Sequence, residues 1–561
     1  MTTLTIALAL TVGLQQTTPP ATPTAPAAGR PPVRLPARVS GDVSMSGEAY
    51  GVNGVQARRP GQSWHMSFSP QLTLFGSFTV GISALLSSEG SDLRQNISQF
   101  GLNPRYKWAT FHIGDFSQSY SGYTLQGTRL RGAGVDLRPG FLRFSLQGGQ
   151  SQRTVAAGAA GLVYKRSLYA ALLGVGREGS NYVDVMVVKA KDDVSSLAAT
   201  LADTTLLDTI PEALRPRVEM RPQENLVVGL QGQIGLFARR LVLKTEAAGA
   251  LITKDLESPM ANPGGVSGGG TVNGVMPLHL STSGDFAYKI DADANLGKGG
   301  IRAGYEYVGA GYTSLGLSYL INDKRAFNLG GNVRLVQGKL NLQAQYQHQN
   351  DNLLNQKIAT TDRNTIVGSA ALLMGRSLST TVTAMVNGIE NNAAVDTFLV
   401  SNHSFALTTS TSVGTTMLGR QTTFSLSYAL QRSSDDNPIT RIPQVTVHNV
   451  STAVQMSLSK AITVSPSVSF AVTQNSAAAS QHNVYAGFRG QGRFGAVRTS
   501  LSATQTWSGG RGVFAVTGQA NYTLPFEGRL SLQLRHTRYD AIGTRPAFQE
   551  SFATLSLARS F

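Results

Sequence analysis

The chain has 561 residues, of which 41% are hydrophobic and only 14% are charged. It contains no cysteine, which excludes disulfides, thiolate metal sites and a cysteine nucleophile. The 48 Lys and Arg against 32 Asp and Glu give a net charge of +16. In a soluble protein this excess would indicate nucleic acid or an anionic surface as partner, whereas in a membrane barrel it indicates an anion-favouring interior or contacts with anionic lipid. No apolar run approaches the roughly 18 residues that a membrane-spanning helix needs.

The first residues have the composition of an export signal followed by a linker. A short apolar stretch over residues 4–14 predicts a secretory signal peptide over 1–15. Residues 16–38 are rich in Pro, Ala and Thr, a composition that cannot build a core, so we expect a periplasmic tether there. The folded part is then expected over residues 39–561.

From residue 39 onward, apolar and polar residues alternate along most of the chain. Phe286, Tyr288 and Ile290, for example, alternate with Lys289 and Asp291. Because successive side chains of a strand point to opposite faces, each such segment has one apolar and one polar face. Segments of about ten alternating residues, repeated along a chain, are typical of transmembrane strands.

The connections between these segments are predicted to be short on one side and long on the other, as in outer-membrane barrels, where the short turns face the periplasm. The predicted short turns are residues 138–140, 237–240, 297–300, 336–338, 375–377, 459–461, 493–495 and 525–528. The predicted long loops are residues 192–223, 254–283, 350–363, 387–396, 432–443, 474–482 and 539–550.

These patterns predict an all-β protein, namely a large antiparallel, transmembrane, up-and-down β-barrel with short periplasmic turns and long extracellular loops. About 25 strands can be identified, but both chain ends should be periplasmic, so the number must be even. Residues 92–128 are the one region where the alternation of chain direction does not give an even number of strands. They either hide one further crossing around 120–127 or fold into the lumen. We expect about 26 strands, with 24 as the alternative count.

The last segment, residues 551–561, alternates apolar and small or polar residues and ends on Phe561. It resembles the closing strand of a bacterial outer-membrane barrel, in which a terminal Phe belongs to the signal read by the barrel-assembly machinery. Phe561 is therefore a candidate assembly signal. Arg559 departs from that pattern, although an Arg at the membrane rim can extend its charge to the headgroups. The alternative is an amphipathic terminal strand of a soluble sheet.

A wider resemblance runs over about residues 100–391. It is carried by the segments 103–108 (NPRYKW), 123–125 (YTL), 132–140 (GAGVDLRPG), 189–193 (KAKDD) and 224–226 (ENL). These are similar to segments of uncharacterised, porin-like outer-membrane β-barrel proteins of Gram-negative bacteria. The resemblance implies a barrel fold and an outer-membrane location, but it brings no substrate and no functional residues.

The sequence offers little enzymatic chemistry. Residues 265–269 match G-x-S-x-G, yet a nucleophile elbow needs a strand before it and a helix after it, and Ser267 lies in a Gly-rich loop. The eight His are scattered, so we expect no catalytic residue, cofactor or metal site. The pairs at 192–193 and 435–436, all Asp, could bind divalent cations beside lipopolysaccharide, but solvated loop charge is the favoured interpretation.

Strand parity places eleven charged side chains towards the lumen. Charge that faces lipid near the midplane costs about 2–4 kcal/mol for Arg or Lys, which favours the inward assignment. Two interpretations have equal weight: wall charges that set a field for permeating ions, or paired charges that hold an internal plug or a hydrated wall together. The candidate lumen-lining charges are Arg143, Lys244, Glu246, Lys289, Asp291, Asp293, Arg302, Glu306, Arg334, Arg498 and Arg535.

Two functions remain open at this point. The first is a passive, porin-like channel whose basic lumen favours anionic or polar solutes. The second is a non-conducting structural or interaction barrel that anchors or assists a surface or secretion assembly. The expected partners are outer-membrane lipids, lipopolysaccharide and the barrel-assembly machinery, and no nucleic acid is expected.

Overall fold

The computed structural model describes residues 37–88, 98–155, 163–197, 221–261, 271–272, 274–375, 377–439, 442–525 and 527–561. The predicted signal peptide, nearly all of the tether and the G-x-S-x-G match with Ser267 lie outside these residues. No helix among the described residues is long and apolar enough to cross a membrane.

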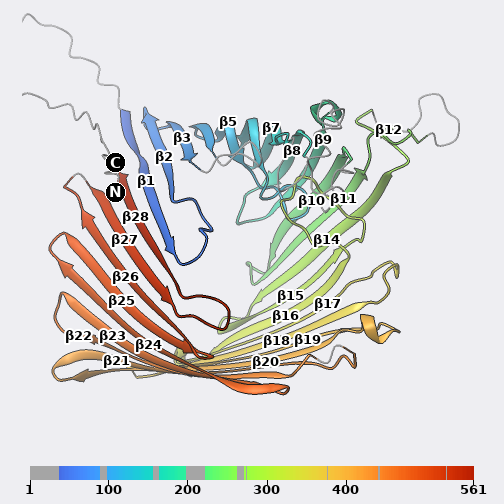
Figure 1. The fold of residues 1–561 in the computed structure, drawn as a ribbon. Coiled ribbons are helices and arrows are strands. Elements are labelled where there is room, and N and C mark those ends of the chain that lie inside the picture. Colours follow the sequence, from blue (N-terminus) through green and yellow to red (C-terminus); the bar gives the residue numbers. More distant parts are fainter. Residues whose placement is uncertain are drawn as a thin grey trace, which may run out of the picture.

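The strands form one sheet of 26 strands that closes on itself (Figure 1). Each strand pairs antiparallel with the next one in the sheet, and closure comes from β1 (Ala37–Asn53) and β28 (Phe548–Ser560). Their register runs from Asp42 opposite Ser560 to Asn53 opposite Gln549. The fold is thus the predicted all-β, up-and-down barrel, and the expected count of 26 strands is confirmed.

The first half of the barrel wall comprises β1 to β15, and a small separate hairpin, β12–β13, lies in the connection between β11 and β14. After β1 the elements are β2 (Gln62–Leu74), β3 (Phe78–Ser87), β4 (Gln99–Tyr106), β5 (Ala109–Ser117), β6 (Arg129–Leu137), β7 (Leu142–Gln152), β8 (Arg166–Gly176), β9 (Tyr182–Asp192), η1 (Val194–Leu197), β10 (Glu224–Leu236), β11 (Leu241–Thr253), β12 (Thr271–Val272), β13 (Met276–Pro277), β14 (Thr282–Asn295) and β15 (Gly299–Val308).

The second half of the wall runs from β16 to β28 and includes two short 3-10 helices in connections. Its elements are β16 (Lys324–Leu335), η4 (Val336–Gly338), β17 (Leu340–Asn350), β18 (Thr361–Met374), β19 (Leu378–Asn391), η5 (Asp396–Phe398), β20 (Ser401–Met417), β21 (Arg420–Asp435), β22 (Val445–Ser457), β23 (Ile462–Asn475), β24 (Ala478–Phe494), β25 (Val497–Ser508), β26 (Arg511–Thr523), β27 (Gly528–Tyr539) and β28.

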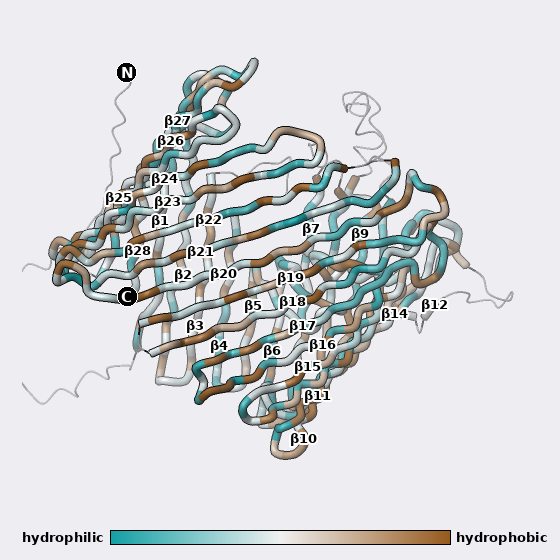
Figure 2. The backbone as a smooth tube through the Cα atoms, turned by 90° about the horizontal axis from the view of Figure 1, so that it is seen from below, coloured by the Kyte–Doolittle hydropathy of each residue, from teal (hydrophilic) through white to brown (hydrophobic). Residues whose placement is uncertain are grey.

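The alternation of residue types fixes which face of each strand turns outward. Figure 2 shows hydrophilic and hydrophobic stretches alternating along the tubes. On β23 the outward Val468 is 51% exposed and lies between Ser467 and Ser469, which face the other way. An apolar exterior of this kind suits lipid, and closure leaves no strand edge with unpaired backbone groups.

Most short turns and both ends of the wall share one end of the barrel, while the two-residue turns after β23 and β25 lie at the other end. Ala37, the first residue of β1, pairs with Leu74, directly before the turn at 75–77. At the β16–β17 turn, Val336, Gln337 and Gly338 have φ of 50°, 55° and 86°, a left-handed run that reverses the chain in three residues. The backbone of Phe561 continues the β1–β28 pairing, since its N–H donates to Gly41 O at 2.9 Å.

The structure decides between the two alternatives for residues 92–128. The segment after β5 folds into the lumen, as the second alternative expected, and the crossings of that region are β4 and β5 rather than residues 120–127. The prediction of a long loop over residues 474–482 was wrong, because β23 and β24 are joined by residues 476–477 alone. The side chain of Asn475 accepts the N–H of Ala477 at 2.9 Å, so polar residues that suggested a loop instead form a tight turn.

The face assignment predicts different outcomes for two adjacent substitutions in the middle of β23. Val468→Arg puts a charge against lipid and should lower the free energy of unfolding by about 2–4 kcal/mol. Ser467→Arg, on the inward face, should change it little. Urea unfolding in lipid vesicles measures both, and equal losses in the two variants would contradict the assignment.

Candidate functional site: the lumen wall and its internal strap

Directly paired residues share a face, so inward rows can be followed from strand to strand. One row contains Gln231, Glu246, Lys289 and Glu306, on β10, β11, β14 and β15. Glu246 contacts a segment inside the barrel, which identifies the face as inward. The same register puts all eleven charged residues singled out from the sequence on this inward face.

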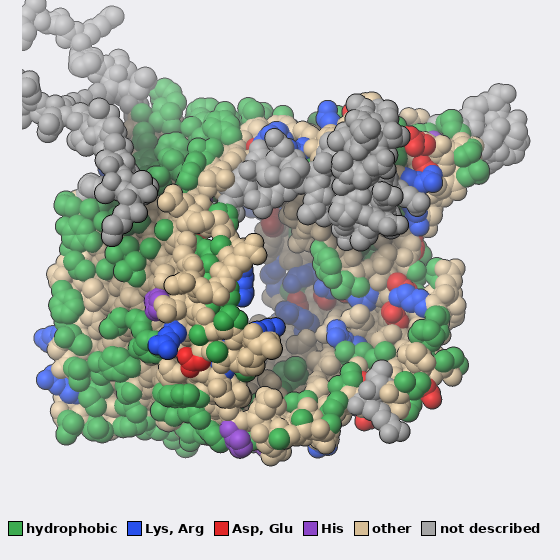
Figure 3. All heavy atoms as spheres, viewed as in Figure 1, with side chains coloured by type: hydrophobic (Ala, Val, Ile, Leu, Met, Phe, Trp, Pro, Cys, Tyr) green, Lys and Arg blue, Asp and Glu red, His purple; other side chains and the backbone are tan. Residues whose placement is uncertain are grey.

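Most of these charges form ion pairs within the arc from β7 to β16. Asp293 receives both Lys244, at 3.1 Å, and Arg302. Lys289 pairs with Asp291 at 3.1 Å, and Glu306 pairs with Lys324 at 2.8 Å. The bases and acids of this arc therefore largely neutralise each other. Figure 3 shows side chains of both signs within a hollow of the molecule.

Arg143 has a partner that the sequence analysis did not single out. Its guanidinium binds Asp184 of β9 through two hydrogen bonds, of 2.8 and 3.0 Å. Asp184 is fully buried and also accepts Gln231 Nε2 at 3.1 Å. A buried carboxylate without such donors would be costly, so this pair holds β7, β9 and β10 in register.

Three of the candidate arginines lack, in the described structure, the ion pairs that most of the other charges form. Among the described residues, Arg334, Arg498 and Arg535 have no ion-pair partner. Arg334 lies with Asp293, Arg302, Asn332 and Gln343 in the lining of a cavity of about 720 Å³ over the inner wall. No carboxylate in the described part of the chain therefore neutralises the charge of these three arginines.

Part of the inner wall of β8 to β11 is apolar, although the outer face of the same strands is apolar as well. On β9, Val185 and Val187 face outward and Met186 and Val188 inward. A bare apolar inner wall would be in contact with water, which is unfavourable, so it must be covered. We call it the apolar inner patch; it consists of Leu168, Ala170, Leu172, Met186, Val188, Ala190, Val227, Ala248 and Ala250.

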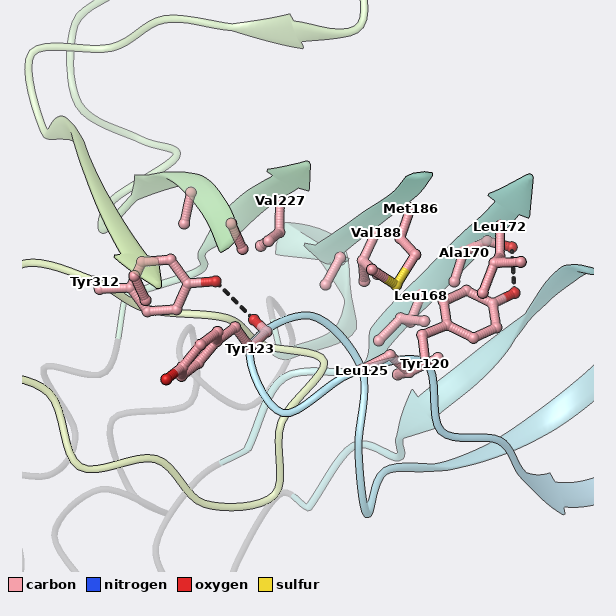
Figure 4. Close-up of a cluster of buried hydrophobic side chains, with 14 of the residues drawn as sticks. Tyr120, Tyr123, Leu125, Leu168, Ala170, Leu172, Met186, Val188, Val227 and Tyr312 are labelled. Carbon is pink, nitrogen blue, oxygen red and sulfur yellow. Dashed lines mark hydrogen bonds between the residues drawn. The ribbon is translucent and has the colours of Figure 1, made fainter. Parts of the chain in front are cut away.

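Two inward connections cover this patch (Figure 4). We call residues 118–128, between β5 and β6, the strap, and residues 309–323, between β15 and β16, the brace. Leu125 and Tyr120 of the strap and Tyr312 of the brace are buried against the patch. Full burial of Leu125 alone is worth roughly 2 kcal/mol. The strap is therefore held as a small hydrophobic core inside the barrel.

Charged wall residues anchor the strap at Tyr123. Glu246 accepts its backbone N–H at 2.8 Å, and Glu306 accepts its hydroxyl at 3.0 Å. The hydroxyl of Tyr120 donates to Ser145 Oγ at 2.8 Å. Two of the predicted lumen charges thus hold internal structure in place, as in the second interpretation drawn from the sequence.

The strap and the brace are also bonded to each other. The hydroxyl of Tyr312 donates to Tyr123 O at 2.6 Å, and Ser314 Oγ donates to Thr124 O at 2.6 Å. Gly316 passes so close that an added Cβ would lie 2.6 Å from Thr124 O, so a side chain there would separate the two segments. They form one unit along this arc of the wall.

The brace is fastened at its base to the wall and to a neighbouring outer loop. Asn225, buried on β10, accepts the N–H of Leu315 at 2.9 Å and donates to Thr313 O at 3.0 Å. Asp323 accepts the N–H groups of Asn352 and Leu353 at 3.0 and 2.8 Å and pairs with Lys357. Burial alone would raise the pKa of Asp323, but these donors together lower it below its usual value.

The two Asp pairs of the outer loops are engaged by protein groups. Asp192 is buried and binds Arg166 through hydrogen bonds of 2.6 and 2.9 Å. Asp435 accepts the N–H of Asn437 at 2.9 Å. In the part of the chain that the structure describes, no group of three or more His, Asp or Glu side chains is arranged to hold a metal ion.

The comparisons with known proteins give structural similarity only. No family model and no curated protein matches the sequence. A chain of the Escherichia coli P pilus tip assembly intermediate PapC-PapD-PapK-PapG matches 96% of this chain, with 11% identity and a TM-score of 0.47, and this chain covers 63% of that one. Acinetobacter baumannii OccAB3 matches 61% of this chain and is itself covered to 93%, with 12% identity and a TM-score of 0.31.

A third similar structure is Pseudomonas aeruginosa OpdK with vanillate, which matches 93% of this chain and is covered to 99%, with 10% identity and a TM-score of 0.28. All three TM-scores lie below 0.5, so the assignment depends on the chain's own geometry: a closed antiparallel sheet with an apolar exterior and a polar interior. The chain is an outer-membrane β-barrel.

Weakening the strap should open the lumen without unfolding the barrel. Tyr120→Ala with Leu125→Ala removes two side chains that are buried on the apolar inner patch, at a local cost of several kcal/mol, about 2–5 for Leu alone. We expect more frequent and larger conductance fluctuations in planar bilayers. Leu173→Ala, on the outer face of β8, serves as the control. Unchanged conductance in the double variant would show that the strap does not narrow the pore.

Acid should release the base of the brace. Because the folded-state pKa of Asp323 is lowered, its contribution is present above the unfolded value of about 3.9 and is lost as the pH falls through the folded value. Below about pH 4, the protection factors of the amides in residues 309–323 should therefore fall. In Asp323→Asn these protection factors should already be low at neutral pH. Equal protection in the two proteins at pH 7 would contradict this role.

Proposed function

We propose that the barrel is a passive, porin-like channel whose lumen favours anionic or polar solutes. The observation that carries this proposal is the uneven distribution of charge on the inner wall. In the arc from β7 to β16, bases and acids pair with each other. From β22 to β27, the inward positions carry arginines and no carboxylate. The field inside a water-filled lumen is therefore positive on balance.

Polar but uncharged side chains complete the wall opposite the strap. Ser410 and Ser427 of β20 and β21 face Ser451 and Ser469 of β22 and β23 in one inward row. Hydroxyl groups of this kind hydrate readily and exchange hydrogen bonds with water and with solutes. A wall of this composition supports passage of hydrophilic solutes without a dedicated binding pocket.

A second candidate function is a non-conducting barrel that anchors or assists a surface or secretion assembly. The strap and the brace favour it, because they occupy the lumen along the arc from β8 to β15. In this case the internal segments would serve stability, and partners would bind the outer loops. Outer-membrane lipid, lipopolysaccharide and the barrel-assembly machinery remain the proposed partners for either function, with Phe561 as the proposed assembly signal.

Reversal potentials in a KCl gradient test the channel. The open barrel should prefer chloride, and the preference should fade at high salt because charge is screened over about 8–10 Å at physiological ionic strength and over less at higher salt. Replacing Arg334, Arg498 and Arg535 together by Gln should reduce the preference, while replacement by Lys should preserve it. A cation preference of the unmutated barrel would exclude the anion channel, and a barrel without conductance would favour the structural function.

A further inference from the structure

The inner faces of β24 to β27 carry six arginines and no carboxylate. The guanidinium of Arg511, on β26, lies over the rings of Tyr539 and Phe548, which leaves five others. Arg489 and Arg493 lie on β24, Arg498 on β25, and Arg529 and Arg535 on β27. All five are exposed within the barrel. Within the part of the chain that the structure describes, Arg489 alone of the five has a side-chain partner close by, the amide oxygen of Gln491. We call this group the arginine patch.

The register arranges the arginine patch in parallel rows. In the row farther from the short turns, Arg489 and Arg535 lie at the two ends, with Ser502 and Thr517 between them. In the row nearer the short turns, Arg493 lies directly opposite Arg498. Arg489 and Arg493 are four residues apart on one strand, a separation of about 13 Å, and β24 and β27 are about 14 Å apart across the sheet.

A row of uncharged hydrogen-bonding groups lies between the two charged rows. It consists of Gln491, Ser500, Gln519 and Gln533, one from each of the four strands. Three amides offer both donors and acceptors, and the hydroxyl offers both as well. Along the strand direction, the surface therefore presents guanidinium groups on both sides of the middle row, and this row can form hydrogen bonds with neutral hydroxyl groups.

The structure itself does not compensate this concentration of charge. Like charges directly opposite one another on neighbouring strands are unfavourable, as for Arg493 and Arg498. The inward carboxylates of β28 and β1 have other partners: Glu550 accepts the hydroxyl of Tyr50 at 3.0 Å, Glu48 lies 3.9 Å from Arg59, and Asp42 accepts the hydroxyl of Ser560 at 2.6 Å. Among the described residues, no carboxylate pairs with the five guanidinium groups. An anion from outside the protein would supply the missing partner.

We infer that the arginine patch is a binding surface for a polyhydroxylated anion with several charges, that is, an anionic oligosaccharide. Guanidinium groups bind carboxylate through two parallel hydrogen bonds, and the two charged rows need a ligand with at least two anionic groups. The middle row would bond to sugar hydroxyls between those groups. This inference rests on the proposed channel function and names the class of solute that the channel would take.

Titration calorimetry on the full chain in detergent tests this surface without relying on conductance. The probe is tetragalacturonate, with maltotetraose as the neutral chain of the same length and tripolyphosphate as the anion without hydroxyl groups. We expect tetragalacturonate to bind at least tenfold more tightly than either comparison compound. In planar bilayers it should block the current from the side of the short turns.

Paired substitutions locate the binding. Arg493→Gln with Arg498→Gln, and separately Arg489→Gln with Arg535→Gln, should each weaken tetragalacturonate binding about tenfold or more. Arg420→Gln, which removes an exposed arginine on the outward face of β21, should leave binding unchanged. Slower migration of boiled than of unboiled protein on detergent gels shows that each variant still folds, because a closed barrel resists detergent until it is heated.

The outcomes separate this inference from the channel proposal. Anion selectivity without tetragalacturonate binding overturns the inference alone. Tetragalacturonate binding in a barrel that does not conduct overturns the channel and supports the binding surface. Tripolyphosphate binding as tight as that of tetragalacturonate overturns the role of the middle row, and equal weakening by Arg420→Gln overturns the location.

Discussion

Closure of the sheet between β1 and β28 is the constraint on which the rest of the structure depends. Within hydrocarbon every backbone N–H and C=O must find a partner in the protein, and a sheet satisfies all of them only when its first and last strands pair. The twelve residue pairs from Asp42–Ser560 to Asn53–Gln549 meet this need. Closure also creates an interior, so every strand has two distinct environments, and the alternation of side chains follows from that difference.

The strap shows what happens where the alternation is lost. Strands β8 to β10 are apolar on both faces, so one apolar face turns into a water-filled space. The chain resolves this by folding residues 118–128 and 309–323 inward, so that Leu125, Tyr120 and Tyr312 cover the patch. Because the strap has its own polar backbone groups, the wall must supply acceptors, and Glu246 and Glu306 do so at Tyr123. Charges that look like pore electrostatics in the sequence are in part internal anchors.

How far the sequence predicts this molecule depends on the range of the interactions involved. Strand alternation is local, so the fold class, the count of 26 strands and most turns could be predicted from it. The turn after Asn475 could not, because a side-chain bond to Ala477 converts a polar stretch into a tight hairpin. The partner of Arg143 could not be predicted either, since Asp184 lies two strands away and its burial depends on the completed wall. The apolar character of both faces of β9 is the signal in the sequence from which a cover over the inner face could be predicted.

These features together divide the lumen into two arcs with different physics. From β8 to β15 the wall is lined by internal segments and by charges that neutralise each other, so this arc offers little field to a solute. From β22 to β27 the wall is uncovered by the strap and carries arginines without carboxylates, among hydroxyl and amide groups. Under the proposed channel function, a solute that passes the strap moves along the arc in which the arginines have no carboxylate partner, so the steric and electrostatic contributions would act in the same direction. The strap would then serve a purpose beyond covering apolar residues, because it would leave the open path on the side of the arginines, whose charge is screened over roughly 8–10 Å at physiological salt.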